Sequence, residues 1–270
     1  MCFHQLDWNR MWQEARRKKS WRRKGKDDWS KRAAGFAART EGSSYADSFL
    51  ALMNPASSWR VLDMGCGPGT LALPLARMVS GVTAVDFSHD MLEILRQKAE
   101  GDGLRNLRTV ECSWSDDWQK HGIGVHDAAI ASRSLAVDDL RDALTRLDRV
   151  AEKAVFLTDR VGATPFDAQA FAAVGRTFEP GPDYIYTVNL LYQMGITAKV
   201  DFITLERQDV YDTVDDAVAS YSWMLDRLSP EEMKKLQRFV KERTMPTPDG
   251  KVRLHRDQPA RWAFISWHKE

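Results

Sequence analysis

Residues 61–70, Val-Leu-Asp-Met-Gly-Cys-Gly-Pro-Gly-Thr, constrain the fold of this chain more than any other stretch. A short apolar run passes into a glycine-rich loop, and residues 70–78 continue with a helical pattern. In α/β proteins, a strand, a glycine turn and a helix in this order bring backbone N–H groups to a nucleotide-like ligand. The stretch therefore predicts an α/β sheet with a ligand site at this loop.

The spacing of the glycines differs from that of the dinucleotide fingerprint Gly-x-Gly-x-x-Gly. Gly69 lies one residue too early to be the third glycine, and Thr70 stands in its place. Asp63, two residues before Gly65, would repel a pyrophosphate. Its carboxylate suits a ligand with an amine and a sulfonium, and S-adenosylmethionine has both.

The pattern Asp63-x-Gly65-x-Gly67-x-Gly69 resembles the first motif of the class I S-adenosylmethionine-dependent methyltransferases. The resemblance covers residues 25–160 by motif and the remainder by the order of elements. It implies a seven-stranded, mostly parallel sheet with an antiparallel last strand, helices on both faces, N-terminal lid helices and an α-helical insertion near the C-terminal strands. We expect one domain over residues 1–270, divided into a basic arm with lid helices (1–55), a cofactor-binding core (56–160) and acceptor-side helices with C-terminal strands (161–270).

A second acidic residue lies at the distance that a ribose contact requires. Residues 82–85 form a strand that ends at Asp86, 21 residues after Gly65. A carboxylate at this spacing meets ribose hydroxyls, and each contact contributes about 1.5–3 kcal/mol. A solvated aspartate at a strand end is the alternative.

The resemblance implies further cofactor contacts around the loop and the next two strands. Family members often place an acid after the third strand, here residues 106–112, to accept from the adenine amino group, but Ser113 stands there. Trp114 would cover the adenine face, and Ser113, Ser115 or a backbone group would meet its edge. Cys66 is interpreted as a small space-filling residue of the loop rather than a nucleophile. The expected cofactor-binding residues are Trp29, Asp63, Gly65, Cys66, Gly67, Gly69, Thr70, Asp86, Phe87, Ser88, Met91, Ser113, Trp114, Ser115, Ser132 and Arg133.

Two arginines follow neighbouring central strands on the acceptor side. Arg133 and Arg160 come after the strands at 127–131 and 154–158, whose carboxyl ends face ligands in open α/β sheets. They could clamp a carboxylate or phosphate of the acceptor, or pair with nearby acids such as Asp138 or Asp159. An aromatic-rich insertion follows, and it builds either the acceptor pocket or core packing. The tentative acceptor-binding residues are Arg133, Arg160, Tyr184, Tyr186 and Tyr192.

The N-terminal arm is basic and rich in tryptophan. Residues 8–32 carry eleven lysines and arginines against three acidic residues, with four tryptophans interleaved. Such a segment can contact nucleic acid, or it can dock its tryptophans onto the domain. The net charge of the chain is only +1, so we expect docking, with Trp29 and Phe36 on one helical face and Asp28 as N-cap. Residues 29–33 resemble the lid helix of the family.

The sequence predicts a methyltransferase that uses S-adenosylmethionine and acts on a small-molecule acceptor, and the two arginines suggest that the acceptor is anionic. An Asn/Asp-Pro-Pro-aromatic tetrad and a Pro-Cys pair, typical of enzymes that methylate nucleic-acid bases, are absent after the fourth strand. An RNA methyltransferase and a non-catalytic cofactor-binding partner subunit remain alternatives. In-line transfer needs alignment more than acid or base catalysis. His126, His255, Tyr184 and Tyr186 are candidate bases, and none is assigned.

The cysteines and the short apolar runs of the sequence argue against a metal site, a disulfide framework and a membrane-spanning segment. Cys2, Cys66 and Cys112 form neither a metal-ligand pair nor a disulfide framework, so we expect no metal site and a reducing, cytoplasmic setting. No apolar run approaches the ~20 residues that span a bilayer, so no membrane partner is expected.

Overall fold

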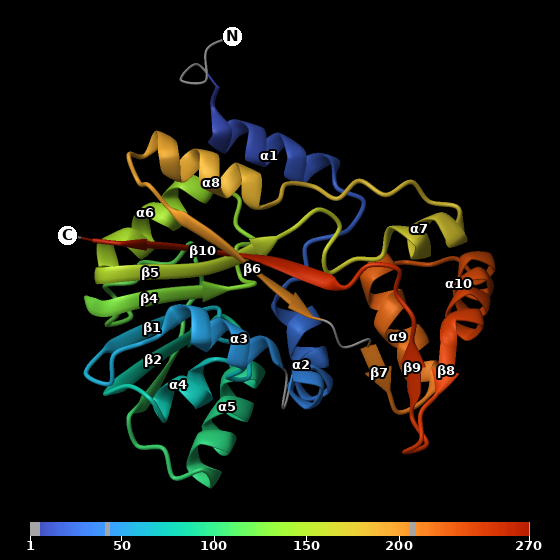
Figure 1. The fold of residues 1–270 in the computed structure, drawn as a ribbon, viewed down its shortest axis with the longest axis horizontal. Coiled ribbons are helices and arrows are strands. Elements are labelled where there is room, and N and C mark those ends of the chain that lie inside the picture. Colours follow the sequence, from blue (N-terminus) through green and yellow to red (C-terminus); the bar gives the residue numbers. More distant parts are fainter. Residues whose placement is uncertain (1–5, 41–43, 206–208, 270) are drawn as a thin grey trace.

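A central sheet of seven strands organises the computed structural model, which describes residues 6–40, 44–205 and 209–269 (Figure 1). The strand order is β3-β2-β1-β4-β5-β10-β6. The first five strands along the chain are parallel, and β10 runs antiparallel between β5 and β6. The predicted α/β fold with an antiparallel last strand is therefore confirmed. The strands are β1 (Arg60–Met64), β2 (Gly81–Asp86), β3 (Leu107–Glu111), β4 (His126–Ser132), β5 (Ala151–Arg160), β6 (Lys199–Leu205) and β10 (Ala260–His268).

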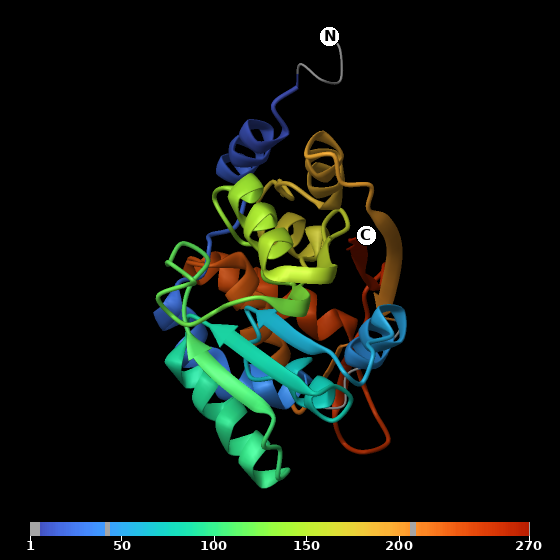
Figure 2. The ribbon, with the colours of Figure 1, turned by 90° about the vertical axis from the view of Figure 1, so that its left-hand side faces the viewer.

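Helices cover both faces of the sheet. One face carries α1 (Trp8–Lys18), α6 (Leu140–Val150) and α8 (Tyr184–Gln193). The other carries α3 (Ser44–Met53), α4 (Ala72–Ala76) and α5 (His89–Gly101). The view in Figure 2, turned by 90°, also separates α1 and α6 from α5 by the sheet. No described helix is long and apolar enough to cross a membrane.

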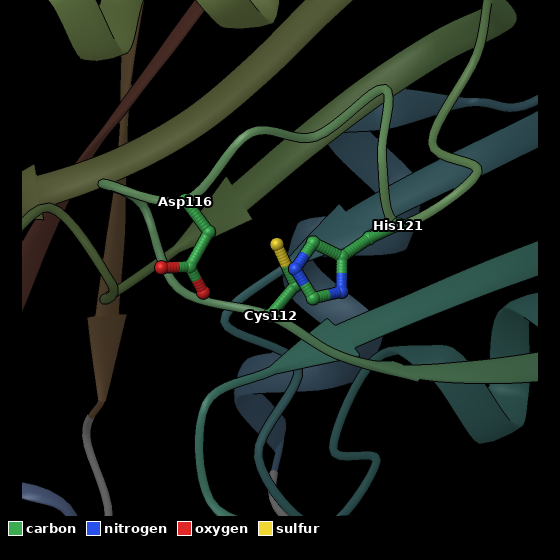
Figure 3. Close-up of side chains that lie close together, drawn as sticks. All are labelled: Cys112, Asp116 and His121. Atoms are coloured by element: carbon green, nitrogen blue, oxygen red, sulfur yellow. The ribbon is translucent and has the colours of Figure 1, made fainter.

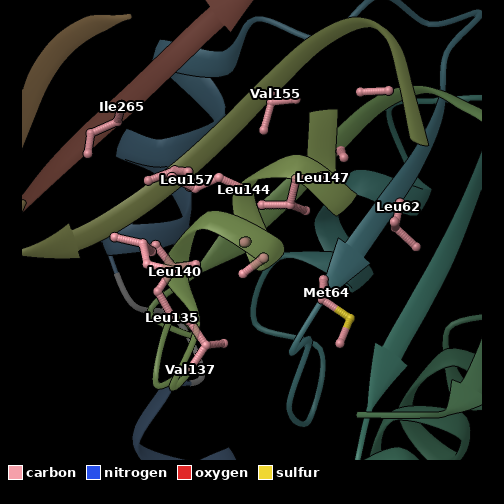
Figure 4. Close-up of a cluster of buried hydrophobic side chains, with 14 of the residues drawn as sticks. Leu62, Met64, Leu135, Val137, Leu140, Leu144, Leu147, Val155, Leu157 and Ile265 are labelled. Carbon is pink, nitrogen blue, oxygen red and sulfur yellow. The ribbon is translucent and has the colours of Figure 1, made fainter. Parts of the chain in front are cut away.

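The packing of α6 illustrates how one helix joins the core. Its N-terminus is capped by the Asp139 carboxylate, which accepts from the Asp142 N–H. Leu140, Leu144 and Leu147 recur at helical spacing and are fully buried. They contact the same apolar cluster as the strand residues drawn in Figure 4, which include Leu62, Met64, Val155 and Leu157. The packing of α6 thereby fixes the loop that joins β4 to α6.

A second, smaller unit lies beyond the carboxyl ends of β4 and β5 (Figure 1). It contains α7 (Ala168–Val174), α9 (Val214–Leu225), α10 (Pro230–Arg243) and a three-stranded sheet in the order β7-β9-β8. The strands of this sheet are β7 (Asp209–Tyr211), β8 (Thr244–Pro246) and β9 (Val252–Leu254). The unit has its own apolar core, which includes Phe171, Tyr221 and Leu236. The pattern Thr213-x-x-Asp216 predicts a helix at α9, and Ser229-Pro230-Glu231-Glu232 predicts one at α10. Strands of three residues carry no readable alternation, so the sequence does not indicate the small sheet.

Helix α2 (Lys26–Thr40) lies between the two parts of the molecule (Figure 1). It packs along α5 on one side, and its Trp29 indole contacts the Trp223 indole of α9 on the other, with ring centroids 5.9 Å apart. Ala33 and Ala37 are buried because small side chains allow close packing. The predicted lid helix therefore exists and extends over fifteen residues.

Three local predictions are wrong. Asp28 is not the N-cap of α2, because the helix begins at Lys26 and the Asp28 carboxylate accepts from the Gly25 N–H and from Arg22. The spacing of Tyr45, Phe49 and Leu52 predicts one buried helical face, but Leu52 of α3 is 37% exposed. The sequence also predicts a helix that opens at Thr164-Pro165 and reaches Phe178, but α7 begins after its N-cap Asp167 and ends at Val174.

Candidate active site

The glycine loop after β1 holds its three glycines in conformations that other residues rarely adopt. Gly65, Gly67 and Gly69 have φ angles of +79°, +54° and +92°. A Cβ atom at Gly65 would lie 2.4 Å from the Ser134 Cβ, and one at Gly69 would lie 2.4 Å from the Leu95 Cδ1. A Cβ at Gly67 would meet no atom within 4 Å. The outer glycines are thus required by packing, whereas Gly67 borders open space that a ligand can approach.

Asp86 connects this loop to the start of α5. Its carboxylate accepts from the Gly67 N–H at 2.9 Å and from the Ser88 N–H at 2.8 Å. Burial raises the pKa of the Asp86 carboxyl, and the two N–H donors act in the opposite direction. Ser88 caps α5 by accepting from the Met91 N–H, and its hydroxyl lies 3.3 Å from that of Ser30 on α2. The predicted ribose partner therefore lies beside the glycine loop and under the lid helix.

Asp63 is a buried carboxylate with an unsatisfied oxygen. The residue is 1% exposed, and its Oδ2 accepts no hydrogen bond from any described residue. Burial, together with the smaller effect of the nearby Asp86, raises the pKa of the Asp63 carboxyl to about 8. Buried polar atoms in proteins almost always have a hydrogen-bond partner. A cationic ligand beside the glycine loop would supply one for the Asp63 Oδ2, so the residues of this site fit S-adenosylmethionine.

The loop after β3 borders the same region through its tryptophan. The Trp114 Nε1 donates to the Ser134 carbonyl at 3.1 Å, which ties the loop to the end of β4. The Ser113 and Ser115 hydroxyls lie 3.0 Å apart. Asp116 accepts from the Ser113 N–H, so it closes this turn and caps no α-helix.

Two further residues near the lid have positions that bear on the cofactor. Cys66 is buried, and burial raises the pKa of its thiol well above the usual value, in agreement with a space-filling role. Glu111, which was not among the predicted site residues, lies at the end of β3. It accepts from Lys26 of α2 at 2.5 Å, and it contacts His89 at 3.1 Å.

The two neighbouring residues Trp29 and Ser30 of α2 face different parts of the molecule. Trp29 faces Phe36 and α9, while Ser30 faces Ser88. Ser30 is thus the one of the two that faces the N-terminus of α5, next to Asp86.

Tyr45, Ser132 and Thr158 form a buried hydroxyl cluster where β4 and β5 end. The Tyr45 hydroxyl lies 2.6 Å from the Ser132 Oγ and 2.7 Å from the Thr158 Oγ1. Burial raises the pKa of the Tyr45 phenol. Sequence reasoning missed Tyr45 as a site residue because its spacing with Phe49 indicates only a buried helical face.

Arg133 follows Ser132 directly and stacks on this cluster. Its guanidinium carbon lies 4.1 Å from the centre of the Tyr45 ring and 5.9 Å from that of Trp262. Its φ of +55° is strained for a residue with a side chain, and such strain gathers at functional sites. No carboxylate of the described residues forms an ion pair with it. The predicted alternative, pairing with Asp138, is not found, because Asp138 pairs with Arg16 and Arg23.

Arg160 is engaged by backbone carbonyls and by an aromatic ring. Its guanidinium donates to the carbonyls of Pro180 and Pro182 and stacks over Trp21, 4.9 Å from the ring centre. Burial lowers the pKa of this arginine. The guanidinium of Arg160, one of the two arginines of the predicted clamp, therefore already has partners within the protein.

The three tyrosines of the insertion belong to α8, and each has different surroundings. Tyr186 meets the indoles of Trp8 and Trp12 with centroid distances of 5.8 and 6.4 Å. Tyr184 meets Phe202 at 5.6 Å, and Tyr192 is 59% exposed. The first two thus match the core-packing alternative.

His126, a candidate base, lies at the opposite edge of the sheet. It begins β4, and its Nε2 lies 2.9 Å from the Thr83 Oγ1. It lines a hollow of about 380 Å³ with residues that start β1 and β2, including Arg60 and Gly81. Burial lowers the pKa of this histidine. Because His126 lies at the amino end of β4, it is separated from the glycine loop, which follows the carboxyl end of β1.

One group of side chains has the composition of a metal site. Cys112, Asp116 and His121 offer ligand atoms within 4.8 Å of one another (Figure 3). However, burial raises the pKa of the Cys112 thiol to about 11, which opposes the thiolate that a metal requires. Asp116 also accepts from the Ser113 N–H. We assign no metal to this group.

Comparison with known proteins identifies the family. A family model described as a methyltransferase domain matches residues 61–174, from β1 through α7. An uncharacterized protein of Haemophilus influenzae is 37% identical over 246 residues, which cover 89% of this chain and 88% of that protein. A putative methyltransferase from Bacillus halodurans has a similar structure, with a TM-score of 0.58 at 15% identity, over 84% of this chain and 99% of that one. The chain belongs to the class I S-adenosylmethionine-dependent methyltransferases.

A further relative has a named reaction. The ubiquinone/menaquinone biosynthesis C-methyltransferase of Zymomonas mobilis is 23% identical over 211 residues, which cover 78% of this chain and 79% of that enzyme. The predicted enzyme class and the predicted methyl donor, S-adenosylmethionine, are confirmed by the family.

Proposed function

We propose that the protein transfers the methyl group of S-adenosylmethionine to a small-molecule acceptor that carries an anionic group beside Arg133. The observation that carries this proposal is the guanidinium of Arg133, stacked on Tyr45 and without an ion-pair partner among the described residues. Arginine in such a position favours planar anions such as carboxylates. It follows β4 at the carboxyl edge, where acceptor and donor meet in sheets of this kind.

In the proposed donor site, Asp86 binds the ribose hydroxyls and Asp63 faces the cationic end of the cofactor. Gly67 leaves room for the ligand to approach the backbone, and Ser30 on α2 covers Ser88 from above. Trp114 lies against the adenine. The cofactor supplies the electrophilic methyl group when it is bound, so the residues of this chain contribute by alignment and by exclusion of water.

The packing of the N-terminal arm supports a small molecule over RNA. Trp12 is 2% exposed, and its Nε1 donates to the Val137 carbonyl at 3.0 Å. Six of the basic residues of the arm are ion-paired with acids of the domain or of the arm itself: Arg10, Arg16, Arg22, Arg23, Lys24 and Lys26. Charges used in this way are less available to phosphates of a nucleic acid.

The test is transfer of labelled methyl from S-adenosylmethionine into fractionated cell extract, followed by mass identification of the product. We expect label in the small-molecule fraction, resistant to ribonuclease. Arg133→Gln should raise the KM for the acceptor about tenfold or more and leave cofactor affinity unchanged. Arg149→Gln, an exposed arginine on α6, is the matched control. Label that appears only in RNA, or cofactor binding without transfer to any fraction, would contradict the proposal.

A further inference from the structure

A hollow lies at the amino ends of the central strands, away from the glycine loop. Its volume is about 380 Å³, within the range of small-molecule sites. Four neighbouring strands, β3, β2, β1 and β4, contribute lining residues: Arg108, Gly81, Thr83, Arg60 and His126. These strand ends lie opposite to the C-terminal unit (Figure 1). The hollow therefore belongs neither to the donor site nor to the proposed acceptor site.

Glycines leave this space open. Gly81, Gly122 and Gly124 all line the hollow. A Cβ at Gly81 would lie 3.9 Å from the Arg60 Cγ and 3.7 Å from the Asn106 carbonyl oxygen, and both are ordinary contact distances. A Cβ at Gly124 would meet no atom within 4 Å. The hollow thus exists because side chains are missing at these positions, although the packing would admit small ones.

Two guanidinium groups reach the same loop beside the hollow. The Arg60 Nη2 donates to the Val125 carbonyl at 2.7 Å, and the Arg108 Nη2 donates to the Gly122 carbonyl at 2.8 Å. The two acceptors are three residues apart in the chain, so one short loop holds both guanidiniums. Each guanidinium has five N–H donors, and one of them is used in this way. Further donors of both arginines are therefore available to a ligand.

The charges of these arginines are not neutralised within the hollow. Among the described residues, no aspartate or glutamate lines it, and neither Arg60 nor Arg108 forms a salt bridge. The Asp127 carboxylate, next in the chain to His126, pairs with Lys153 at 2.6 Å and accepts from the Arg60 backbone N–H at 2.7 Å. Lys153 is the main cause that lowers the pKa of the Asp127 carboxyl, and the Arg60 charge contributes less. Since Lys153 already occupies this acid, the hollow keeps a net positive charge.

The uncharged side chains of the hollow are polar. The His126 Nδ1 lies 2.8 Å from the Gly124 carbonyl oxygen, so this nitrogen carries the hydrogen, and the Nε2 accepts from the Thr83 hydroxyl at 2.9 Å. The Asn106 amide nitrogen donates to two backbone carbonyls at 2.8 and 3.0 Å. Its side-chain oxygen accepts no hydrogen bond from a described residue. A ligand hydroxyl would find an acceptor there.

From these observations we infer that the hollow binds the phosphate group of a small hydroxylated ester. Two guanidiniums match the nearly two negative charges of a phosphate monoester, and their forked donors suit its oxygens. The volume leaves room for a body beyond the phosphate, and the polar lining suits a hydroxylated body. Because the glycine loop lies at the other end of the strands, this ligand is distinct from the methyl donor. The inference does not rest on the proposed function.

The test uses the full chain with glycerol 3-phosphate as the probe. Calorimetry should give saturable binding that saturating S-adenosylmethionine does not displace, and the backbone N–H signals of Gly122 and Gly124 should shift in NMR spectra. The double variant Arg60→Gln/Arg108→Gln should bind the probe at least tenfold more weakly with unchanged cofactor affinity. Both arginines are exposed, so folding should be preserved. Arg105→Gln, at an exposed arginine outside the lining, is the matched control and should bind as the unchanged protein does.

A second variant separates the shape of the hollow from its charge. Gly81→Val should fill the space beside Arg60 and weaken probe binding at least tenfold, although both arginines remain. The pKa of His126 reports on the bound charge. Burial lowers this pKa most, and Arg60 and Arg108 lower it further, so a bound phosphate should raise it in NMR titrations.

Four results would overturn the inference. Probe binding that the double variant does not weaken would place the phosphate elsewhere, and competition with S-adenosylmethionine would place it in the donor site. Inorganic phosphate that binds as tightly as glycerol 3-phosphate would indicate a site for the free ion. Binding of a single-stranded RNA oligonucleotide at the hollow, without binding of the probe, would indicate a nucleic acid. None of these measurements depends on methyl transfer, so the proposed function is tested separately.

Discussion

Ser134 occupies the space that a side chain at Gly65 would need. A Cβ at residue 65 would come within 2.4 Å of the Ser134 Cβ and 2.9 Å of its Oγ. The Ser134 Oγ donates to the Met64 carbonyl at 2.7 Å, and the Ser134 carbonyl accepts from Trp114. One serine thus fixes the glycine loop, the end of β4 and the loop after β3 to one another.

The first prediction separates packing from ligand approach within the glycine loop. Gly65→Ala should lower the free energy of unfolding by about 1–3 kcal/mol, because it combines a strained φ with a clash against the Ser134 side chain. Gly67→Ala is strained as well but meets no atom within 4 Å, so it should cost less stability and more cofactor affinity. Denaturant unfolding and calorimetry of both variants measure the contrast. Equal losses of stability would show that the contact with Ser134 is unimportant.

The second prediction concerns the ribose partner. Asp86→Ala should weaken cofactor binding on the order of 10–100-fold, because the ribose loses its charge-assisted hydrogen bonds. Asp90→Ala, an exposed acid in the first turn of α5, controls for the charge. Calorimetry that gives unchanged affinity for Asp86→Ala would remove this residue from the site.

The third prediction is a dependence of stability on pH through Asp63. Its pKa is about 8 in the folded protein without ligand, against 3.8 as the ordinary value, so the folded state holds the proton more tightly. The contribution to stability is complete below a pH of about 4 and is lost as the pH rises toward about 8. Urea unfolding of the ligand-free protein between these limits should show the decline, and Asp63→Asn should reduce it.

The same carboxyl should release a proton when the cationic cofactor binds. At pH 7 most Asp63 carboxyls are protonated in the free protein, and the cation favours the carboxylate. Calorimetry in buffers of different ionisation enthalpy counts the protons. Because the cofactor's own amine also titrates, the informative quantity is the difference between the unchanged protein and Asp63→Asn. No difference would mean that Asp63 does not face the cation.

The fourth prediction tests the docking of the arm. Trp12→Ala should lower the free energy of unfolding by about 3–5 kcal/mol, since the indole is buried between α1 and the core. Trp12→Phe should cost less, because it keeps the ring but loses the hydrogen bond to Val137. Tyr192→Ala, at a side chain that is 59% exposed, should change stability by less than about 0.5 kcal/mol. A negligible effect of Trp12→Ala would mean that α1 is loosely attached.

The sequence indicates the proposed donor site more directly than the proposed acceptor site, for a physical reason. The proposed donor site uses Gly67, in the loop after β1, and Asp86, at the end of the neighbouring strand β2, and their spacing of 19 positions is visible in the sequence. The partners of Arg160 are carbonyls of residues 180 and 182, and backbone atoms leave no trace in the residue type. The hollow at the amino ends of the strands joins residues of four strands, and only the strand order of the sheet brings Arg108 near Arg60.

Helix α2 has consequences beyond the donor site. Ser30 meets Ser88 on the donor side, while the preceding residue, Trp29, meets Trp223 on the other. A displacement of α2 that admits the cofactor would also move Trp29 against Trp223. Cofactor binding should therefore also change the surroundings of Trp223 in the C-terminal unit. We expect α2 to transmit the arrival of the methyl donor to that unit, in addition to covering the donor site.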